Sequence, residues 1–175
     1  MITEEEFLKS ELGWGIGFHN PDFVNLADVT AHQVKDYPIK SVMDYGAGTG
    51  VYAAAFHNAG YQTSAFDIWQ AHTDYIKEYA PHLKIIDKPI TTDLMLFIEV
   101  SEHMTDKELN KLFKGIKPTY ILHSSTSEVT DWDGDWGHIN LKTQNKWIEF
   151  FKGKGYEMIK NLSYPTPYAK LFKLK

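Results

Sequence analysis

The sequence contains neither cysteine nor arginine. Without cysteine, the chain forms no disulfides and no thiolate metal sites. All 18 basic residues are lysines, and they stand against 23 acidic residues, so the net charge is −5. Arginine is the residue best shaped to bind phosphates and base edges through two parallel hydrogen bonds. Its absence and the acidic balance argue against a nucleic acid as partner.

Long apolar runs are also missing. No stretch approaches the roughly 18 residues that a membrane span needs, and the start MITEEEFLKS does not resemble a secretory signal. We therefore expect no membrane partner and a cytoplasmic location. The 175 residues, 43% of them hydrophobic, suffice for one domain with its own core.

Strand and helix patterns alternate along most of the chain, which predicts an α/β fold with parallel strands and helices on both faces of the sheet. The last two strands, YEMIKNLSY and YAKLFKLK, have no helix between them and must be antiparallel. We therefore expect a seven-stranded mixed sheet in a single domain. Residues 1–37 are expected to form an N-terminal helical arm or lid over the active site, and residues 38–175 the core.

A glycine-rich turn follows the first predicted strand, in SVMDYGAGTGVYAAAF. Gly46, Gly48 and Gly50 have the spacing G-x-G-x-G, which differs from the G-x-G-x-x-G that suits a pyrophosphate. Asp44 precedes them and would repel a pyrophosphate, but it suits a ligand with an ammonium or sulfonium charge. A tight turn without a ligand is the alternative explanation of the glycines.

A second acid, Asp67, ends the second predicted strand 17 residues beyond Gly50. A carboxylate there can accept hydrogen bonds from ribose hydroxyls. The residues thus point to a cationic, ribose-containing small molecule at the carboxyl ends of the first two strands. S-adenosylmethionine fits that description.

Four features together resemble the class I S-adenosylmethionine-dependent methyltransferases over residues 38–175: VMDYGAGTG, the acid in AFDI, the run DLMLFIEVSEH and the closing strand pair. The resemblance implies a Rossmann-like class I methyltransferase fold. It also implies that the three glycines lie along the methionine and ribose parts of the cofactor and that Asp67 holds the ribose diol. Ile68 and Trp69 would flank the adenine, Asp87 would reach its amino group, and Glu99 would contact the methionine end.

Methyl transfer requires the protein to align the acceptor and to remove a proton where the acceptor carries one. Candidate groups are Glu102 and His103 in EVSEHMT, and His138 in the segment DWDGDWGHINLK. We expect His138 to be the base; its alternative role is a structural histidine. For Glu102 and His103 the alternative is solvation and capping of a helix end.

The same residues resemble a different site. The pattern E-x-x-E-H with a downstream histidine is similar to the metal site of small-RNA 2′-O-methyltransferases, with Glu99, Glu102, His103 and His138 as the matching positions. Oxygen and nitrogen ligands of this kind suit Mg²⁺ or Mn²⁺. We expect no metal, because the pattern also occurs in methyltransferases that bind none. The missing arginines and the acidic net charge also argue against an RNA end as substrate.

Aromatic residues mark two possible acceptor-binding segments. Trp14 and Phe18 lie in GWGIGFHNPDF, whose glycines suit a lid; the alternative is an arm packed on the core. Trp132 and Trp136 offer stacking surfaces for a sugar or aromatic acceptor, or else cover the edge of the sheet. We expect O-methylation of a small-molecule or carbohydrate hydroxyl. The alternatives are a protein that binds or degrades S-adenosylmethionine without methyl transfer, a metal-assisted RNA 2′-O-methyltransferase and a nicotinamide-dependent oxidoreductase.

Overall fold

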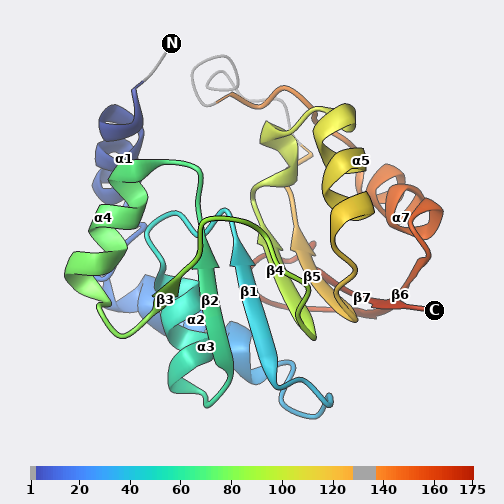
Figure 1. Cartoon of the computed structure of the whole chain (residues 1–175), viewed down its shortest axis with the longest axis horizontal. Helices are drawn as coiled ribbons and strands as arrows, with labels where there is room; N and C mark the ends of the chain where they lie inside the picture. The colour runs from blue at the N-terminus through green and yellow to red at the C-terminus, as the bar shows by residue number, and fades with distance from the viewer. Residues whose placement is uncertain (1–2, 128–136) are drawn as a thin grey trace. The chain divides into compact units, whose positions relative to one another are not determined.

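The computed structural model describes residues 3–127 and 137–175. The chain divides into two compact units, an N-terminal unit, Met1–Ile90, and a C-terminal unit, Thr91–Lys175 (Figure 1). Each unit has strands and helices of its own.

The N-terminal unit contains three parallel strands, in the order β3-β2-β1. Its elements are α1 (Glu4–Gly13), α2 (Pro21–His32), β1 (Ser41–Tyr45), α3 (Val51–Asn58), β2 (Gln62–Phe66), α4 (Gln70–Tyr79) and β3 (Lys84–Ile85). Asp44 pairs with Ala65 in the register of β1 and β2, so the acid of the first strand lies beside the end of the second. Helix α1 packs on α4, and α2 packs on α3 (Figure 1).

The first two helices begin at residues that are typical of helix starts. Thr3 and Glu6 form a reciprocal capping box at α1, in which Glu6 N donates to Thr3 Oγ1 at 3.2 Å and Thr3 N donates to Glu6 Oε2 at 2.8 Å. Asn20 caps α2 by accepting from Asp22 N, with Pro21 at the first helical position. These caps satisfy backbone N–H groups that have no partner within the helix.

The C-terminal unit begins with β4 and β5 in parallel and ends in an antiparallel pair. Its described elements are β4 (Leu94–Ile98), η1 (Ser101–His103), α5 (Asp106–Gly115), β5 (Tyr120–Ser124), α7 (Gln144–Gly153), β6 (Tyr156–Asn161) and β7 (Lys170–Leu174). Strand β7 runs antiparallel to both β5 and β6. The predicted antiparallel closing pair is therefore confirmed.

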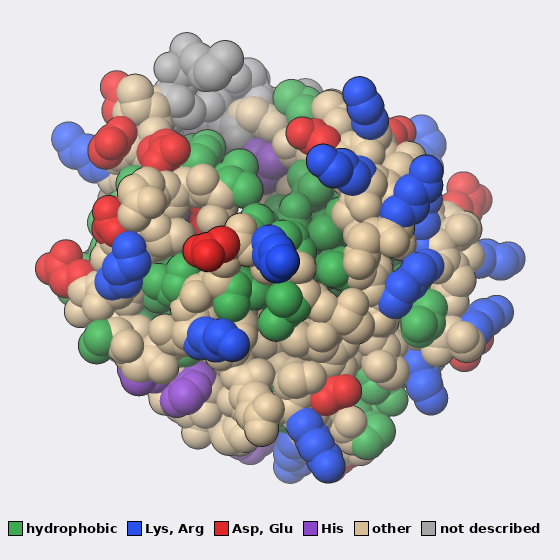
Figure 2. Space-filling view, viewed as in Figure 1, with side chains coloured by type: hydrophobic (Ala, Val, Ile, Leu, Met, Phe, Trp, Pro, Cys, Tyr) green, Lys and Arg blue, Asp and Glu red, His purple; other side chains and the backbone are tan. Residues whose placement is uncertain are grey.

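Helix α5 shows how the C-terminal unit separates its core from its surface. Leu109, Leu112 and Phe113 are buried, whereas the lysines at positions 107, 111 and 114 are exposed. Figure 2 shows blue lysine side chains over the part of the surface where Figure 1 places α5 and α7. The apolar residues recur with the helical period and explain why this segment forms an amphipathic helix.

The fold class is the predicted one, Rossmann-like α/β with a seven-stranded mixed sheet. Strand β3 is short, because only Lys84 and Ile85 pair with β2, opposite Ser64 and Ala65. Among the described residues, no helix is long and apolar enough to cross a membrane.

Candidate cofactor and active-site residues

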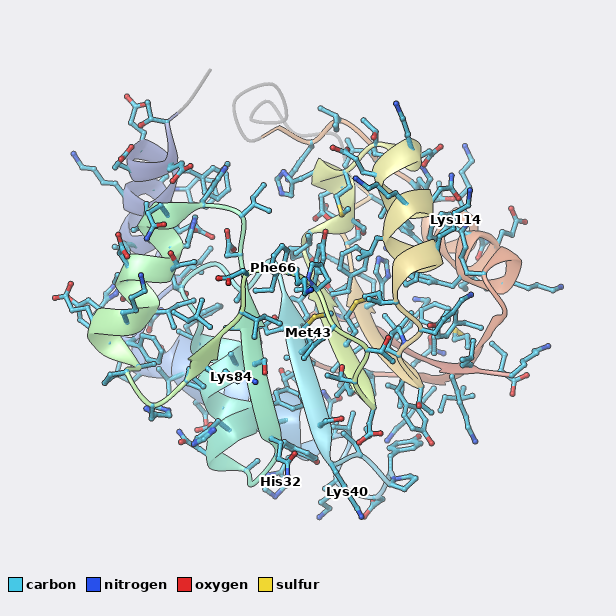
Figure 3. All side chains as sticks on the ribbon, viewed as in Figure 1. His32, Lys40, Met43, Phe66, Lys84 and Lys114 are labelled. Atoms are coloured by element: carbon cyan, nitrogen blue, oxygen red, sulfur yellow. The ribbon has the colours of Figure 1, made fainter. Side chains whose placement is uncertain are left out.

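The glycine turn between β1 and α3 has the backbone conformation that explains its composition. Gly46, Gly48 and Gly50 all have positive φ, at 71°, 52° and 78°. Residues other than glycine rarely adopt this region, because their Cβ atom meets the backbone. The carbonyl of Phe66, at the end of β2 (Figure 3), accepts from Gly46 N at 2.8 Å and from Ala47 N at 3.0 Å. The turn is thus tied to the second strand.

Asp67 is fixed beside this turn by two backbone N–H groups. Its Oδ2 accepts from Gly48 N and its Oδ1 from Trp69 N, both at 2.9 Å. The side chain is only 9% exposed. A carboxylate held in this way keeps one orientation and retains lone pairs for a ligand.

Asp44 is a buried carboxyl group at the end of β1. It is 3% exposed, and within the described ranges its Oδ2 has no hydrogen-bond partner. Burial, and secondarily the charge of Asp67, raise the pKa of Asp44 to about 7. A cation at this position would supply the missing partner and stabilise the charged form.

The residues after β2 and β3 differ in exposure. The side chain of Ile68 is 78% exposed, which is unusual for an apolar residue beside a polar turn. Trp69 meets Phe7 edge to face at 4.7 Å and stacks on His72 at 5.4 Å between ring centroids. Asp87 is exposed after β3.

The N-terminal unit therefore fits an adenosine carrying a positive charge. The positive-φ turn leaves room at Gly48, Asp67 offers acceptors for a diol, and the unpartnered Oδ2 of Asp44 suits an ammonium group. The exposed face of Ile68 suits a planar base. The structure brings Asp44, the glycines and Asp67 together, as the sequence predicts.

In the C-terminal unit, three of the predicted residues form a cluster. Ligand atoms of Glu102, His103 and His138 all lie within 4.8 Å of one another. The rings of His103 and His138 are 4.8 Å apart between centroids. Glu102 and His103 belong to the short helix η1, and His138 comes from a loop 35 residues further along the chain.

Peptide groups hold this loop against η1. The backbone N–H groups of Ile139 and Asn140 both donate to the carbonyl oxygen of Glu102, at 2.9 and 3.0 Å. The side chain of Asn140 also donates to Met104 O at 2.8 Å. The hydrogen bonds from the two residues that follow His138 therefore place it beside His103.

Glu102 is a fully buried carboxyl group. It is 0% exposed, and neither of its oxygens has a hydrogen-bond partner in the part of the chain that the structure describes. Burial, together with the nearby charge of Glu99, raises its pKa well above the ordinary value. The suggested role in solvating a helix end is wrong for Glu102, because the side chain does not reach solvent.

Glu99 follows β4 directly and has a strained conformation, with φ at 52°. Its Oε2 accepts from Thr126 N at 3.0 Å, and its Oε1 accepts from the hydroxyl of Ser124, which is also 2.9 Å from the hydroxyl of Thr166. Both carboxylate oxygens are thus engaged within the protein. The metal-ligand group that the geometry offers contains Glu102, His103 and His138.

Tyr168 is a residue of this region that the sequence did not suggest. Burial, followed by the charges of Glu99 and Glu102, raises its pKa to about 12. The side chains of Thr126 and Thr166 act in the opposite direction and lower this pKa. No local motif marks this tyrosine, and the only signal in the sequence is its place in the turn between the last two strands.

The proposed acceptor-binding aromatics have different environments. Phe18 is partly buried and stacks with Tyr75 and Tyr79 at 6.2 and 6.4 Å between centroids, which favours a packed arm over a free lid at that residue. Trp14 is 58% exposed. Trp132 and Trp136 lie outside the described residues.

No protein-family model matches the sequence, and no curated protein does either. Solved structures do. Mitomycin 7-O-methyltransferase MmcR is similar with a TM-score of 0.63 and 13% identity over 90% of this chain and 55% of its own, so this chain spans little more than half the length of that enzyme.

Two further structures match over most of their own length. Magnesium protoporphyrin IX methyltransferase (ChlM) from Synechocystis PCC 6803, solved with bound SAH, has a TM-score of 0.62 and 12% identity over 87% of this chain and 83% of its own. The methyltransferase domain of bacterial CtHen1-C has a TM-score of 0.61 and 14% identity, covering 86% of this chain and 98% of that domain. The chain has the fold of the class I S-adenosylmethionine-dependent methyltransferases.

Proposed function

We propose that this chain is an S-adenosylmethionine-dependent methyltransferase that acts on a hydroxyl group of a small molecule or sugar. The observation that carries the proposal is the pairing of the positive-φ glycine turn with the fixed carboxylate of Asp67 and the unpartnered carboxyl of Asp44. The O-methyltransferase MmcR, which shares the fold, supports an oxygen acceptor.

Each part of the cofactor would have its own residues. Asp67 would accept from the ribose diol, Asp44 would pair with the ammonium, and Ile68 and Trp69 would cover the adenine. Asp87 would reach the adenine amino group. When bound, the cofactor supplies an electrophilic methyl group on a sulfonium leaving group. Residues 1–37 would serve as an arm on the cofactor-binding part of the chain, a role to which the packing of α1 on α4 contributes.

In this proposal His138 removes the proton from the acceptor hydroxyl. Neutral imidazole is suited to this task near neutral pH. His103 and the buried Glu102, whose ligand atoms lie within 4.8 Å of those of His138, would adjoin the imidazolium that results. The hydrogen bonds from Ile139 and Asn140 to Glu102 keep the base in place.

A second candidate is a metal-assisted 2′-O-methyltransferase acting on RNA. The observation that favours it is the cluster of Glu102, His103 and His138, together with the unpartnered oxygens of Glu102. An oxygen and nitrogen set of this kind fits Mn²⁺ or Mg²⁺, which would lower the pKa of a coordinated hydroxyl. The similar fold of the CtHen1-C domain adds to this candidate. The absence of arginine weighs against an RNA substrate.

Calorimetric titration with S-adenosylmethionine and S-adenosylhomocysteine, with and without EDTA, tests the cofactor. Saturable binding of both is expected. Binding of neither ligand would refute the methyltransferase proposal. Preference for NADH in a thermal-shift comparison would instead indicate an oxidoreductase. Breakdown of S-adenosylmethionine without any acceptor would indicate a degrading enzyme.

Turnover and metal content separate the two candidates. His138→Ala is expected to cut methyl transfer at least tenfold while sparing cofactor affinity, and Lys146→Ala on the exposed face of α7 is the matched control. If EDTA leaves transfer to hydroxylated small molecules unchanged, the histidine base is favoured. If Mn²⁺ titrates with one site that His103→Ala abolishes, and an RNA 3′ end is methylated only with Mn²⁺, the second candidate is favoured.

A further inference from the structure

A buried histidine joins the first helix to the fourth. Nε2 of His72, in α4, donates to Oε2 of Glu11, in α1, at 2.6 Å. The side chains are 2% and 14% exposed, so this contact is largely shielded from solvent. A second link runs beside it, because Ala71 N donates to Glu4 Oε2 at 3.3 Å. Helix α1 is thus attached to α4 by polar contacts in addition to its packing.

The other nitrogen of His72 faces Asp67. Nδ1 lies 3.9 Å from Asp67 Oδ1 and, among the described residues, has no hydrogen-bond partner. The ring is held in this orientation by stacking on Trp69 at 5.4 Å and by the edge of Phe7 at 6.0 Å. The ring of His72 therefore lies between two carboxylates. Glu11 faces its Nε2, and Asp67 faces its Nδ1.

Glu11 also reaches the glycine turn. A Cβ atom on Gly48 would lie 3.5 Å from Glu11 Oε1, so this oxygen is on the open side of the turn while Oε2 holds His72. Gly48 is the residue whose N–H donates to Asp67. Two carboxylates, Glu11 and Asp67, consequently approach Gly48 from different elements.

We propose that Glu11 is a further cofactor-binding residue, which accepts a ribose hydroxyl of the cofactor, and that His72 is the positioning residue that holds Glu11 and Asp67 in place. This inference rests on the proposed function. The two oxygens of Asp67 each accept one backbone N–H and keep one lone pair apiece, and each hydroxyl of a ribose diol can be bound by more than one acceptor. A second carboxylate on the same side of Gly48 supplies the additional acceptor.

The arrangement also makes the contact dependent on pH. The groups facing His72 are the carboxylates of Glu4 and Glu11 from α1 and of Asp67 after β2. Burial acts to lower the pKa of His72, but the hydrogen bond to Glu11 and the three negative charges outweigh it, so the pKa is raised. The stabilisation is therefore complete below the ordinary pKa of histidine and is lost as the pH rises through the raised value.

Calorimetric titration of the full chain with S-adenosylhomocysteine, and with its 2′-deoxyribose and 3′-deoxyribose analogues, tests the inference. Glu11→Gln is expected to weaken binding of S-adenosylhomocysteine about tenfold, whereas Glu5→Gln, an exposed residue of the same helix, leaves it unchanged. The loss should shrink for the analogue that lacks the hydroxyl bound by Glu11, because that ribose donor is missing. A structural defect would affect all three ligands equally.

His72→Gln supplies a second readout. This variant keeps a donor for Glu11 but carries no charge. As the pH rises through the raised pKa of His72, wild-type affinity should decline because His72 loses its proton, and His72→Gln should lack this part of the decline. Thermal unfolding without ligand checks that each variant is folded. Should Glu11→Gln fail to fold, the double variant Glu11→Gln, His72→Gln is titrated instead, because its two amide side chains can hydrogen-bond to each other.

Each outcome is decisive. Wild-type binding with equal affinities for Glu11→Gln and Glu5→Gln would overturn the inference and leave the proposed function intact. An equal loss for S-adenosylhomocysteine and for both its 2′-deoxyribose and its 3′-deoxyribose analogue would overturn the ribose contact. Absence of binding by the wild-type chain would overturn the proposed function and the inference together.

Discussion

The two units differ in the size of the side chains that fill their cores. Small residues dominate the core cluster of the N-terminal unit, which comprises Ala47, Ala53, Ala54, Ala65, Ile76, Ala80 and Leu83. Large aromatic residues are prominent among the fully buried positions of the C-terminal unit, beside leucines on its strands; they include Phe97, Phe113, Trp147, Phe151, Tyr156 and Phe172. Small side chains let the backbone segments of the N-terminal unit approach one another closely. In the C-terminal unit, aromatic rings pack against one another.

This difference accounts for the kind of site that each unit carries. Close backbones around the glycine turn allow peptide N–H groups to fix Asp67, so much of that site is made of main chain. In the C-terminal unit the candidate groups are side chains, brought together from η1 and a distant loop. We therefore expect substitutions that add side-chain atoms to destabilise the N-terminal unit, and substitutions that remove them to destabilise the C-terminal unit.

Removal from the aromatic core should have the largest effect. Phe151 is 0% exposed and lies 4.6 Å from Phe172 and 4.8 Å from His123 between ring centroids. Phe151→Ala is expected to lower the free energy of unfolding by about 3–5 kcal/mol, measured by chemical denaturation. The adjacent, half-buried Phe150 is the control, and Phe150→Ala should cost less. Equal losses would contradict the contrast between the units.

Addition to the glycine turn should come next. At Gly50 a Cβ atom would lie 2.7 Å from Ile76 Cγ1, and φ is 78°. Gly50→Ala is expected to destabilise the chain by about 2–4 kcal/mol, from overpacking and the left-handed conformation together. Gly60→Ala isolates the conformational part, because Gly60 has φ of 96° and nothing within 4 Å of its Cβ position. If the two variants melt alike, the close packing at Gly50 is not the cause.

Loss of the fixed carboxylate should affect ligand binding more than stability. Asp67→Ala is expected to weaken binding of S-adenosylhomocysteine by about 1–3 kcal/mol, because hydrogen bonds to a charged group are lost. Calorimetric titration measures this change. The exposed Asp74, which pairs with Lys77, provides the control variant Asp74→Asn. Unchanged affinity in Asp67→Ala would remove this residue from the ribose.

The smallest expected effect is the release of a proton from Asp44 when the ligand binds. Because burial raises the pKa of Asp44 to about 7, the free protein carries a neutral carboxyl group at pH 6. Pairing with the ligand ammonium requires the charged form, so binding should release up to one proton at pH 6 and almost none at pH 8.5. Titrations in buffers of different ionisation enthalpy count the protons. Asp44→Asn should abolish the release, and a release that persists in this variant would assign it elsewhere.

The N-terminal unit was the more predictable of the two because its signals are local. Thr3 with Glu6, and Asn20 with Pro21, mark helix starts within three residues. The three glycines and Asp67 mark a strand-to-helix turn and the end of the next strand. The contact of Glu11 with His72 was not predictable, because it joins residues 61 apart and depends on how α1 packs on α4.

The C-terminal unit was predictable in its elements but less so in its site. Thr105 and Glu108 have capping-box spacing in the sequence and form that box at the start of α5. The burial of Glu102 could not be inferred, since a glutamate just before a helix is ordinarily solvated. The engagement of Glu99 by Ser124 and Thr126 depends on the alignment of β4 with β5, which periodicity does not specify.

The two hydrogen bonds from Ile139 and Asn140 to the carbonyl of Glu102 have a consequence for engineering and for evolution. Donors and acceptor are all peptide groups, so the frame of the cluster does not depend on the identity of the side chains at positions 102, 103 and 138. Exchanging those side chains one at a time leaves the donors and the acceptor of these two hydrogen bonds in place. A lineage or a designer could convert a proton-accepting pair into a cation-binding set, or the reverse, on an unchanged scaffold.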